Sequence, residues 1–264
     1  MQPILWQIGP IKIHAYGLCL ALAFLIGGWL TTRRGERHGL GEREMTNYIT
    51  VVLISSLIGA RIYYVLAHPD AFAGRWGSVV AIWRGGLVLQ GGIIAAALAS
   101  WSFARRHGWR LGTLADVVAP SLALGEAIGR VGCFLNGCCY GQPAACPWAV
   151  AFPEGSPAHS HFSGTALHPT QLYLVVLQGA VAAALLLFHR SRTLRARYPV
   201  GSGGIFGFYL AGSSAVRFVV DLYRYYEPGD RSVFGWAHSQ VVALVFFAVG
   251  LFLILRLRAG REGS

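Results

Sequence analysis

Charged residues are scarce in this sequence of 264 residues, because only 12% are Asp, Glu, Lys or Arg and only 11 are acidic. A soluble domain carries about 25% charged residues. The low charge, together with 55% hydrophobic residues, excludes an ordinary soluble domain and predicts a membrane protein. The 22 basic residues give a net charge of +11, but they alternate from loop to loop between apolar runs, and this distribution disfavours nucleic-acid binding.

The sequence also lacks a C-x-x-C pair, although it contains 5 cysteines. The spacing C-x4-C-C-x6-C fits neither a zinc motif nor the usual redox pair, so no metal is expected. On an oxidising outer side of the membrane, one or two disulfides are expected, and their pairing stays open. Cys19 lies in an apolar run and is interpreted as a small buried hydrophobe. The other cysteines are Cys133, Cys138, Cys139 and Cys146.

Seven apolar runs are long enough to cross a bilayer, which takes about 17–25 residues each. Arginine clusters follow the first, third, fifth and seventh runs, and by the positive-inside rule these ends face the cytoplasm. We therefore expect an all-α, polytopic membrane bundle of about seven transmembrane helices, with the N-terminus outside and the C-terminus cytoplasmic. The runs lie near 13–30, 48–67, 86–103, 112–129, 168–188, 203–222 and 237–255.

The stretch 129–141 is the most unusual part of the chain, because it places Arg130, Asn136 and three cysteines among four glycines. Glycine lets the backbone bend and approach a ligand. Non-helical backbone at membrane depth occurs only where it is buried in protein or lines a watery cavity. We therefore expect a single membrane domain over residues 1–264, with an outward loop over about 130–165.

Four arginines fall at the predicted outer ends of the apolar runs. Arginine at membrane depth costs about 2.5–3.5 kcal/mol on insertion scales, so such a residue usually has a function. Asp221 and Glu227 lie close to Arg217 and Arg224 in sequence, and an excess of guanidinium groups suits the phosphate of an outer-leaflet lipid. Asp221 can pair with Arg224, in which case one arginine is a scaffold. The four are Arg61, Arg130, Arg217 and Arg224.

Six further motifs follow one another along the chain. They are His14-Ala15-Tyr16-Gly17, Gly59-Ala60-Arg61, Gly91-Gly92, Asp116 to Pro120, His168-Pro169-Thr170-Gln171-Leu172-Tyr173, and Arg217 with Asp221 and Arg224. Together with the stretch 129–141 they resemble the signature of the prolipoprotein diacylglyceryl transferases, bacterial enzymes that attach a lipid to the lipobox cysteine of exported proteins. The resemblance covers most of the chain.

The resemblance implies transfer of the sn-1,2-diacylglyceryl group of phosphatidylglycerol to the lipobox cysteine of a prolipoprotein signal peptide. A thioether forms and glycerol phosphate leaves, so the departing phosphate needs positive charge, which Arg130 and Arg217 are expected to supply. Tyr16 is expected to orient a phosphate or carbonyl oxygen, and His14 is a candidate base. No cofactor is required. The residues expected to bind phosphatidylglycerol are Arg61, Gln90, Arg130, Asn136, Gly141, His168 and Arg224.

Several positions depart from the commonest residues of that family. Gln90 replaces a histidine proposed as the base, so the proton acceptor stays open, with His14 and His168 as candidates. The other departures are Cys133 for asparagine, Cys138 for glutamate, Ser213 for tyrosine and Asp221 for glutamate. Two alternatives remain, a divergent paralogue that only binds anionic lipid and a membrane thiol-disulfide oxidoreductase. In each case we expect a multi-pass protein of the bacterial inner membrane.

Overall fold

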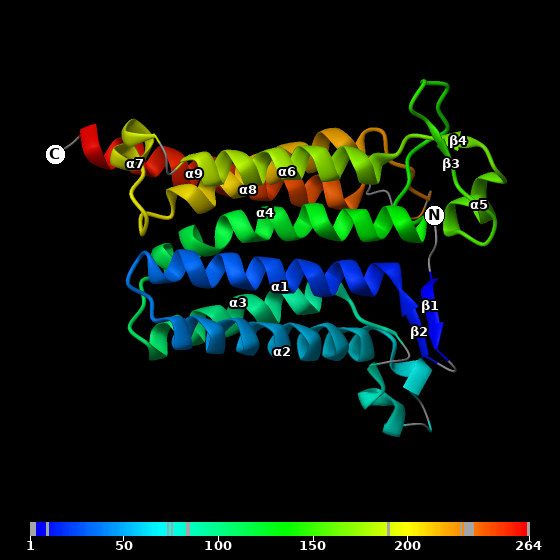
Figure 1. The fold of residues 1–264 in the computed structure, drawn as a ribbon, viewed down its shortest axis with the longest axis horizontal. Helices are drawn as coiled ribbons and strands as arrows, with labels where there is room; N and C mark the ends of the chain where they lie inside the picture. The colour runs from blue at the N-terminus through cyan, green and yellow to red at the C-terminus, as the bar shows by residue number, and fades with distance from the viewer. Residues whose placement is uncertain are drawn as a thin grey trace. The chain divides into compact units, whose positions relative to one another are not determined.

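The computed structural model describes residues 4–8, 11–72, 74, 76–82, 85–188, 191–227, 229 and 235–262. Most of these residues are helical, as predicted (Figure 1). The chain divides into two compact units, one of Met1–Thr31 with Ala115–Ser264 and the other of Thr32–Leu114. The single domain expected over residues 1–264 stays a prediction.

The larger unit is built from long helices that begin and end close to the predicted apolar runs. They are α1 (Ala15–Glu36), α4 (Leu111–Asn136), α6 (Thr170–Phe188), α8 (Gly204–Asp221) and α9 (His238–Glu262). Glycines let α8 and α9 approach closely, since a Cβ on Gly250 would lie 2.6 Å from Ala211 N and 2.7 Å from Gly207 O. Phe188, Tyr198 and Ile205 belong to the buried core of this unit.

The smaller unit contains α2 (Glu42–Ala67) and α3 (Leu89–Arg106), which pack along their length. Gly59 and Gly91 make this packing possible, because a Cβ on Gly91 would lie only 2.3 Å from Gly59 O. The short 3-10 helices η1 (Pro69–Phe72) and η2 (Trp76–Val80) follow α2. Two motif glycines therefore serve helix packing in this unit.

The loop that is predicted to face outward begins at Gly137 and not near residue 130, because α4 continues to Asn136. Gly132 keeps a helical backbone, whereas Gly137 has a φ of +68°, which ends the helix. The loop carries β3 (Val150–Ala151), α5 (Pro157–Phe162) and β4 (Ala166–Leu167), and β3 pairs with β4. The remaining short elements are an antiparallel pair, β1 (Ile4–Ile8) with β2 (Ile11–His14), and α7 (Arg192–Arg197).

Five of the described helices are long and apolar enough to cross a membrane, namely α1, α2, α4, α6 and α9. This confirms a multi-pass helical membrane protein. The other two predicted spans correspond to α3 and α8, each 18 residues long. Polar and charged residues lower their apolar character, with Arg105 and Arg106 at the end of α3 and Arg217 and Asp221 in α8.

Candidate functional site

Tyr16 and Arg130 lie close together in the larger unit, where the start of α1 meets the end of α4. Gly132 allows this contact, because a Cβ there would lie 3.2 Å from Tyr16 Cα and 3.0 Å from Cys19 Cβ. The Tyr16 side chain interacts electrostatically with Arg130. His14 is the last residue of β2, two positions before Tyr16, and its side chain is exposed. Two predicted catalytic residues are thus brought together on different helices.

The Arg130 guanidinium forms no hydrogen bond and no ion pair with the part of the chain that the structure describes. Glu126, one helical turn earlier, attracts it electrostatically. The Glu126 carboxylate is already engaged, because it accepts hydrogen bonds from Gln178 Nε2 at 2.8 Å and from Tyr209 Oη. Arg130 therefore presents free donors to any anion that enters the site.

Asp221 connects the other two arginines of the larger unit. Arg217 Nε donates to Asp221 Oδ2 at 3.1 Å, and Arg224 Nη1 lies 3.7 Å from Asp221 Oδ1. The predicted pairing of Asp221 with Arg224 is confirmed as an ion pair. Ser239 Oγ also donates to Asp221 Oδ2 at 2.7 Å, and its oxygen lies 2.6 Å from Tyr226 Oη. Asp221 is fully buried, so these contacts fix both guanidinium groups.

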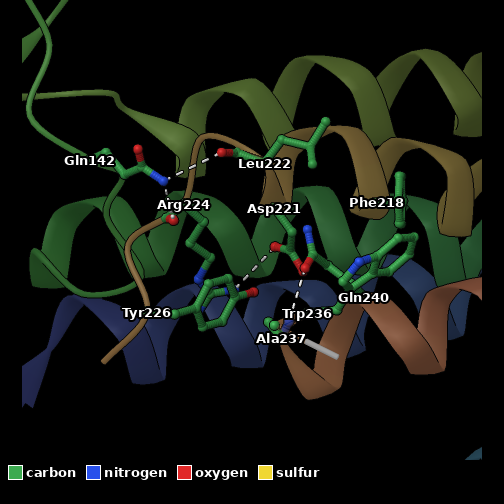
Figure 2. Close-up of a pocket in the computed structure, with 10 residues that line it drawn as sticks. Gln142, Phe218, Asp221, Leu222, Arg224, Tyr226, Trp236, Ala237 and Gln240 are labelled. Carbon is green, nitrogen blue, oxygen red and sulfur yellow. Dashed lines mark hydrogen bonds and ion pairs between the residues drawn. The ribbon is translucent and has the colours of Figure 1, made fainter. Parts of the chain in front are cut away.

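A pocket with a volume of about 320 Å³ opens beside this ion pair (Figure 2). This volume falls at the lower end of the range for small-ligand pockets, about 300–1,000 Å³. Inside it, Arg224 Nη1 is buried without a hydrogen-bond partner among the described residues. Burial lowers the pKa of Arg224, but the Cys139 thiol, Tyr226 and Asp221 outweigh it and raise this pKa above its ordinary value. The lining residues are Gln142, Phe218, Asp221, Leu222, Arg224, Tyr226, Gly235, Trp236, Ala237 and Gln240.

Gly141 lies between two backbone segments that a side chain would push apart. Its amide donates to His168 O at 3.0 Å, and the next residue, Gln142, donates to Tyr223 O at 2.9 Å. A Cβ on Gly141 would lie 2.7 Å from both Tyr223 O and His168 O. The Gln142 side chain reaches the carbonyl oxygen of Arg224 at 3.3 Å (Figure 2). Gly141 thus sets the position of the chain on which Arg224 lies.

His168 precedes α6 and is half-buried among polar side chains. Its Nδ1 lies 3.0 Å from Tyr173 Oη and 3.9 Å from Cys146 Sγ. Trp148 Nε1 donates to the same tyrosine oxygen at 2.7 Å. These contacts fix the imidazole through its Nδ1 atom.

Arg61 belongs to the smaller unit, where its guanidinium holds the loop after α2. It donates four hydrogen bonds, at 2.7–3.0 Å, to carbonyl oxygens of Ser78, Val79, Gly85 and Gly86. A guanidinium has five N–H donors, so only one is left. These contacts show that Arg61 braces this loop, and they favour such a role over the direct phosphate binding expected from the sequence. Gln90 is the second residue of α3 and has an exposed side chain.

All five cysteines are free thiols, so the expected disulfides are absent from this structure, which describes every cysteine of the chain. Cys19 is buried, as predicted. Cys133, Cys138 and Cys139 form a cluster in which the three Sγ atoms lie within 4.8 Å of one another. The spacing of the cysteines along the chain did not predict this cluster. The three thiols come together because α4 ends between Cys133 and Cys138 and the following residues turn back toward the helix.

Sequence reasoning also missed a polar network inside the larger unit. Glu126, Gln178 and Tyr209 come from α4, α6 and α8, and Ser213 Oγ adds a bond of 2.9 Å to Gln178 Oε1. The available signal was Glu126 itself, an acidic residue inside an apolar run. Asp116, which begins one of the six motifs, is structural, because its carboxylate accepts hydrogen bonds from the backbone N–H groups of Gly201, Gly203 and Phe206 at 2.9 Å, around the start of α8.

Comparison with known proteins gives one consistent answer. The family model for prolipoprotein diacylglyceryl transferase matches residues 3–256. Three relatives carry the name phosphatidylglycerol–prolipoprotein diacylglyceryl transferase. The protein of Nitratidesulfovibrio vulgaris (strain Miyazaki F) is 34% identical over 100% of this chain and 96% of its own. Those of Nostoc sp. and Bordetella avium are 37% and 33% identical, over 94% and 99% of this chain and 87% and 97% of their own. The chain belongs to the prolipoprotein diacylglyceryl transferase family.

Proposed function

We propose that this protein transfers the sn-1,2-diacylglyceryl group of phosphatidylglycerol to the lipobox cysteine of prolipoproteins. The observation that carries the proposal is the guanidinium of Arg130, which has no hydrogen-bond or ion-pair partner among the described residues, in the same unit as the arginine pair held by Asp221. Three guanidinium groups face two carboxylates there, Asp221 and Glu126, which leaves a positive site for a phosphodiester. Guanidinium groups bind phosphate oxygens with charge-assisted hydrogen bonds.

The chemistry follows from this charge. The acceptor thiolate attacks the glyceryl carbon, the carbon–oxygen bond breaks, and glycerol phosphate leaves with one more negative charge than it had in the diester. Donors aimed at a charge that grows in the transition state accelerate such a step. Arg130 and Arg217 supply these donors, because among the described residues the Arg130 guanidinium has no hydrogen bond and Arg217 uses only its Nε, for Asp221. The positive site also favours the thiolate form of the acceptor.

The remaining residues bind or position the lipid. Arg224 holds the headgroup from the pocket side, and Tyr16 orients a phosphate or carbonyl oxygen near Arg130. His14 and His168 are the candidate bases. Asn136 and Gln90 donate hydrogen bonds to headgroup oxygens. Gly141 contributes through backbone shape, and Arg61 braces the loop after α2.

The membrane arrangement is part of the proposal. The chain crosses the bacterial inner membrane about seven times, with its N-terminus outside and C-terminus in the cytoplasm, so that phosphatidylglycerol and the signal peptide enter from the bilayer at the outer side. The reaction needs no nucleotide and no nucleic-acid partner.

The test is transfer by the purified protein in phosphatidylglycerol micelles. A synthetic lipobox peptide is expected to gain the mass of one diacylglyceryl group, measured by mass spectrometry. Arg130→Ala and Arg217→Ala are expected to slow the gain strongly, whereas Arg195→Ala, at an exposed position in α7, is the matched control and retains it. A protein that binds phosphatidylglycerol and leaves the peptide unmodified would be an anionic-lipid binder. A thiol count that changes with quinone would indicate an oxidoreductase.

A further inference from the structure

The cluster of Cys133, Cys138 and Cys139 has the dimensions of a metal site. Its three Sγ atoms all lie within 4.8 Å of one another. With zinc–sulfur bonds of about 2.3 Å, tetrahedral geometry separates the sulfur atoms by about 3.8 Å. Each sulfur pair therefore needs to approach by no more than about 1 Å to bind one zinc ion.

The backbone around the cluster is held in an unusual conformation. Cys139 has a φ of +62°, in the left-handed region that costs a residue with a side chain about 1–2 kcal/mol. The buried side chains of Gln171 and Thr170 fix this segment, because they donate to the carbonyl oxygens of Cys138 at 2.7 Å and Cys139 at 2.8 Å. Strained backbone persists where its surroundings determine it and is concentrated at functional sites. The conformation fixed by these hydrogen bonds keeps the Cys139 thiol beside those of Cys133 and Cys138.

Two arginines act electrostatically on the cluster. Arg224 and Arg130 both interact with Cys139 in this way. Three thiolates with one Zn²⁺ carry a net charge of −1, which these arginines balance. The cluster is therefore compatible with the phosphate-binding arginines of the same unit.

A metal site explains the cluster better than a disulfide does. One disulfide uses two of the three thiols and leaves the third as a free thiol beside it. The adjacent Cys138 and Cys139 would form a strained ring. Zinc instead uses all three sulfur atoms, and three protein ligands on tetrahedral zinc leave a fourth position for water or substrate. Cu⁺ also binds soft thiolates, but three of them satisfy it and leave no such position.

We propose that Cys133, Cys138 and Cys139 bind one Zn²⁺ ion whose fourth position receives the lipobox thiol. This inference rests on the proposed function, because it identifies how that site activates its acceptor. Zinc deprotonates a thiol that coordinates it. Tyr16, whose hydroxyl interacts electrostatically with all three thiols and with Arg130, places the cluster beside the residues proposed to bind phosphate.

The step balances without a redox partner. The lipobox thiol releases its proton to water when it binds zinc. Its sulfur then forms a bond to the glyceryl carbon while the carbon–oxygen bond breaks, and glycerol phosphate leaves with the electron pair. The neutral thioether is a weaker ligand and dissociates.

The first experiment measures metal content. Full-length protein purified in detergent without chelator is expected to contain about one zinc per chain by mass spectrometry of the elements. In the Cys133→Ser and Cys138→Ser variants the zinc content is expected to fall at least tenfold. The Cys19→Ala variant, which removes a thiol outside the cluster, is expected to keep its zinc. Copper in place of zinc, or no metal with two thiols lost to a disulfide, would overturn the proposal.

The second experiment tests the fourth position on the unmodified chain, so it does not depend on how a variant folds. Zinc is removed by chelation and replaced with Co²⁺, whose visible bands report tetrahedral thiolate coordination. Adding the lipobox peptide is expected to shift these bands, and the peptide with serine for cysteine is not. Transfer at full rate by the metal-free protein would overturn zinc activation while leaving the transferase intact. Absence of transfer by metal-loaded protein, with the spectral shift present, would instead refute the proposed function alone.

Discussion

Arg217 and Asp221 form a hydrogen bond of 3.1 Å between Nε and Oδ2, one helical turn apart in α8. The bond occupies one of the five donors of the guanidinium. Both Nη groups of Arg217 have no hydrogen bond within the described part of the chain, so Asp221 orients this arginine without using up the donors that we propose bind the phosphate. The fully buried carboxylate is thus a positioning residue for the cations of the site.

Asp221→Asn removes the charge that holds Arg217 and Arg224. Breaking a buried ion pair at one partner costs on the order of 3–5 kcal/mol, and the partial exposure of Arg217 reduces this cost. We expect a lower midpoint of thermal unfolding in detergent and a higher KM for phosphatidylglycerol. Asp221→Glu keeps the charge and is expected to retain most of the activity. Equal KM values for Asp221→Asn and the unmodified protein would show that the pair does not position the arginines.

Arg130→Ala is expected to reduce kcat/KM by about 10²–10³-fold, the loss seen when one preorganised donor to a developing anion is removed. Because the Arg130 guanidinium has no described partner to leave unpaired, the thermal stability is expected to stay within about 0.5 kcal/mol. Arg130→Lys keeps the charge without the forked donors and is expected to be intermediate. Kinetics with the lipobox peptide measure the effect on activity, and thermal unfolding measures the effect on stability. A large loss of stability would indicate that Arg130 is structural.

The long helices of this protein could be predicted from the sequence, because each predicted run is a long apolar segment. Runs as long and apolar as α6 and α9 are typical of membrane-spanning helices. The C-terminal end of α4 could not be predicted in the same way. The glycines of the stretch 129–141 suggested irregular backbone from residue 130, but Gly132 serves close packing against Tyr16, and only Gly137 takes a left-handed conformation. Glycine permits both uses, and sequence alone does not separate them.

The arginines and their carboxylate were also predictable, because charge at membrane depth is rare and Asp221 lies one turn from Arg217. The role of Arg61 could not be predicted, because it depends on backbone carbonyl oxygens, which every residue has. They belong to Ser78, Val79, Gly85 and Gly86. The thiol cluster was missed for a related reason. Its geometry comes from the turn after α4 and from Gln171 and Thr170, more than 30 residues away from the carbonyl oxygens they bind.

Arg61→Ala is expected to loosen the loop after α2, because four hydrogen bonds to its carbonyl oxygens disappear together. Hydrogen exchange should accelerate at residues 78–88, while the amides of α6 stay protected. Arg61→Lys offers one ammonium in place of a fork and should restore little of the protection. If exchange in the loop is unchanged and only KM for phosphatidylglycerol rises, the residue binds lipid directly and does not brace the loop.

Gly141→Ala is expected to disrupt the site through the backbone. The new Cβ would lie 2.6 Å from His168 Cβ and 2.7 Å from two carbonyl oxygens, so the segments that carry His168 and Tyr223 must separate. Overpacking of this kind costs about 1–3 kcal/mol. Gly129→Ala is the matched control, because its Cβ would meet nothing within 4 Å and alanine favours a helix by about 0.5–1 kcal/mol over glycine. We expect thermal unfolding to occur at lower temperature for the first variant and at equal or higher temperature for the second, with activity lost only in the first. Retention of activity by Gly141→Ala would show that the position of Arg224 does not depend on this close approach.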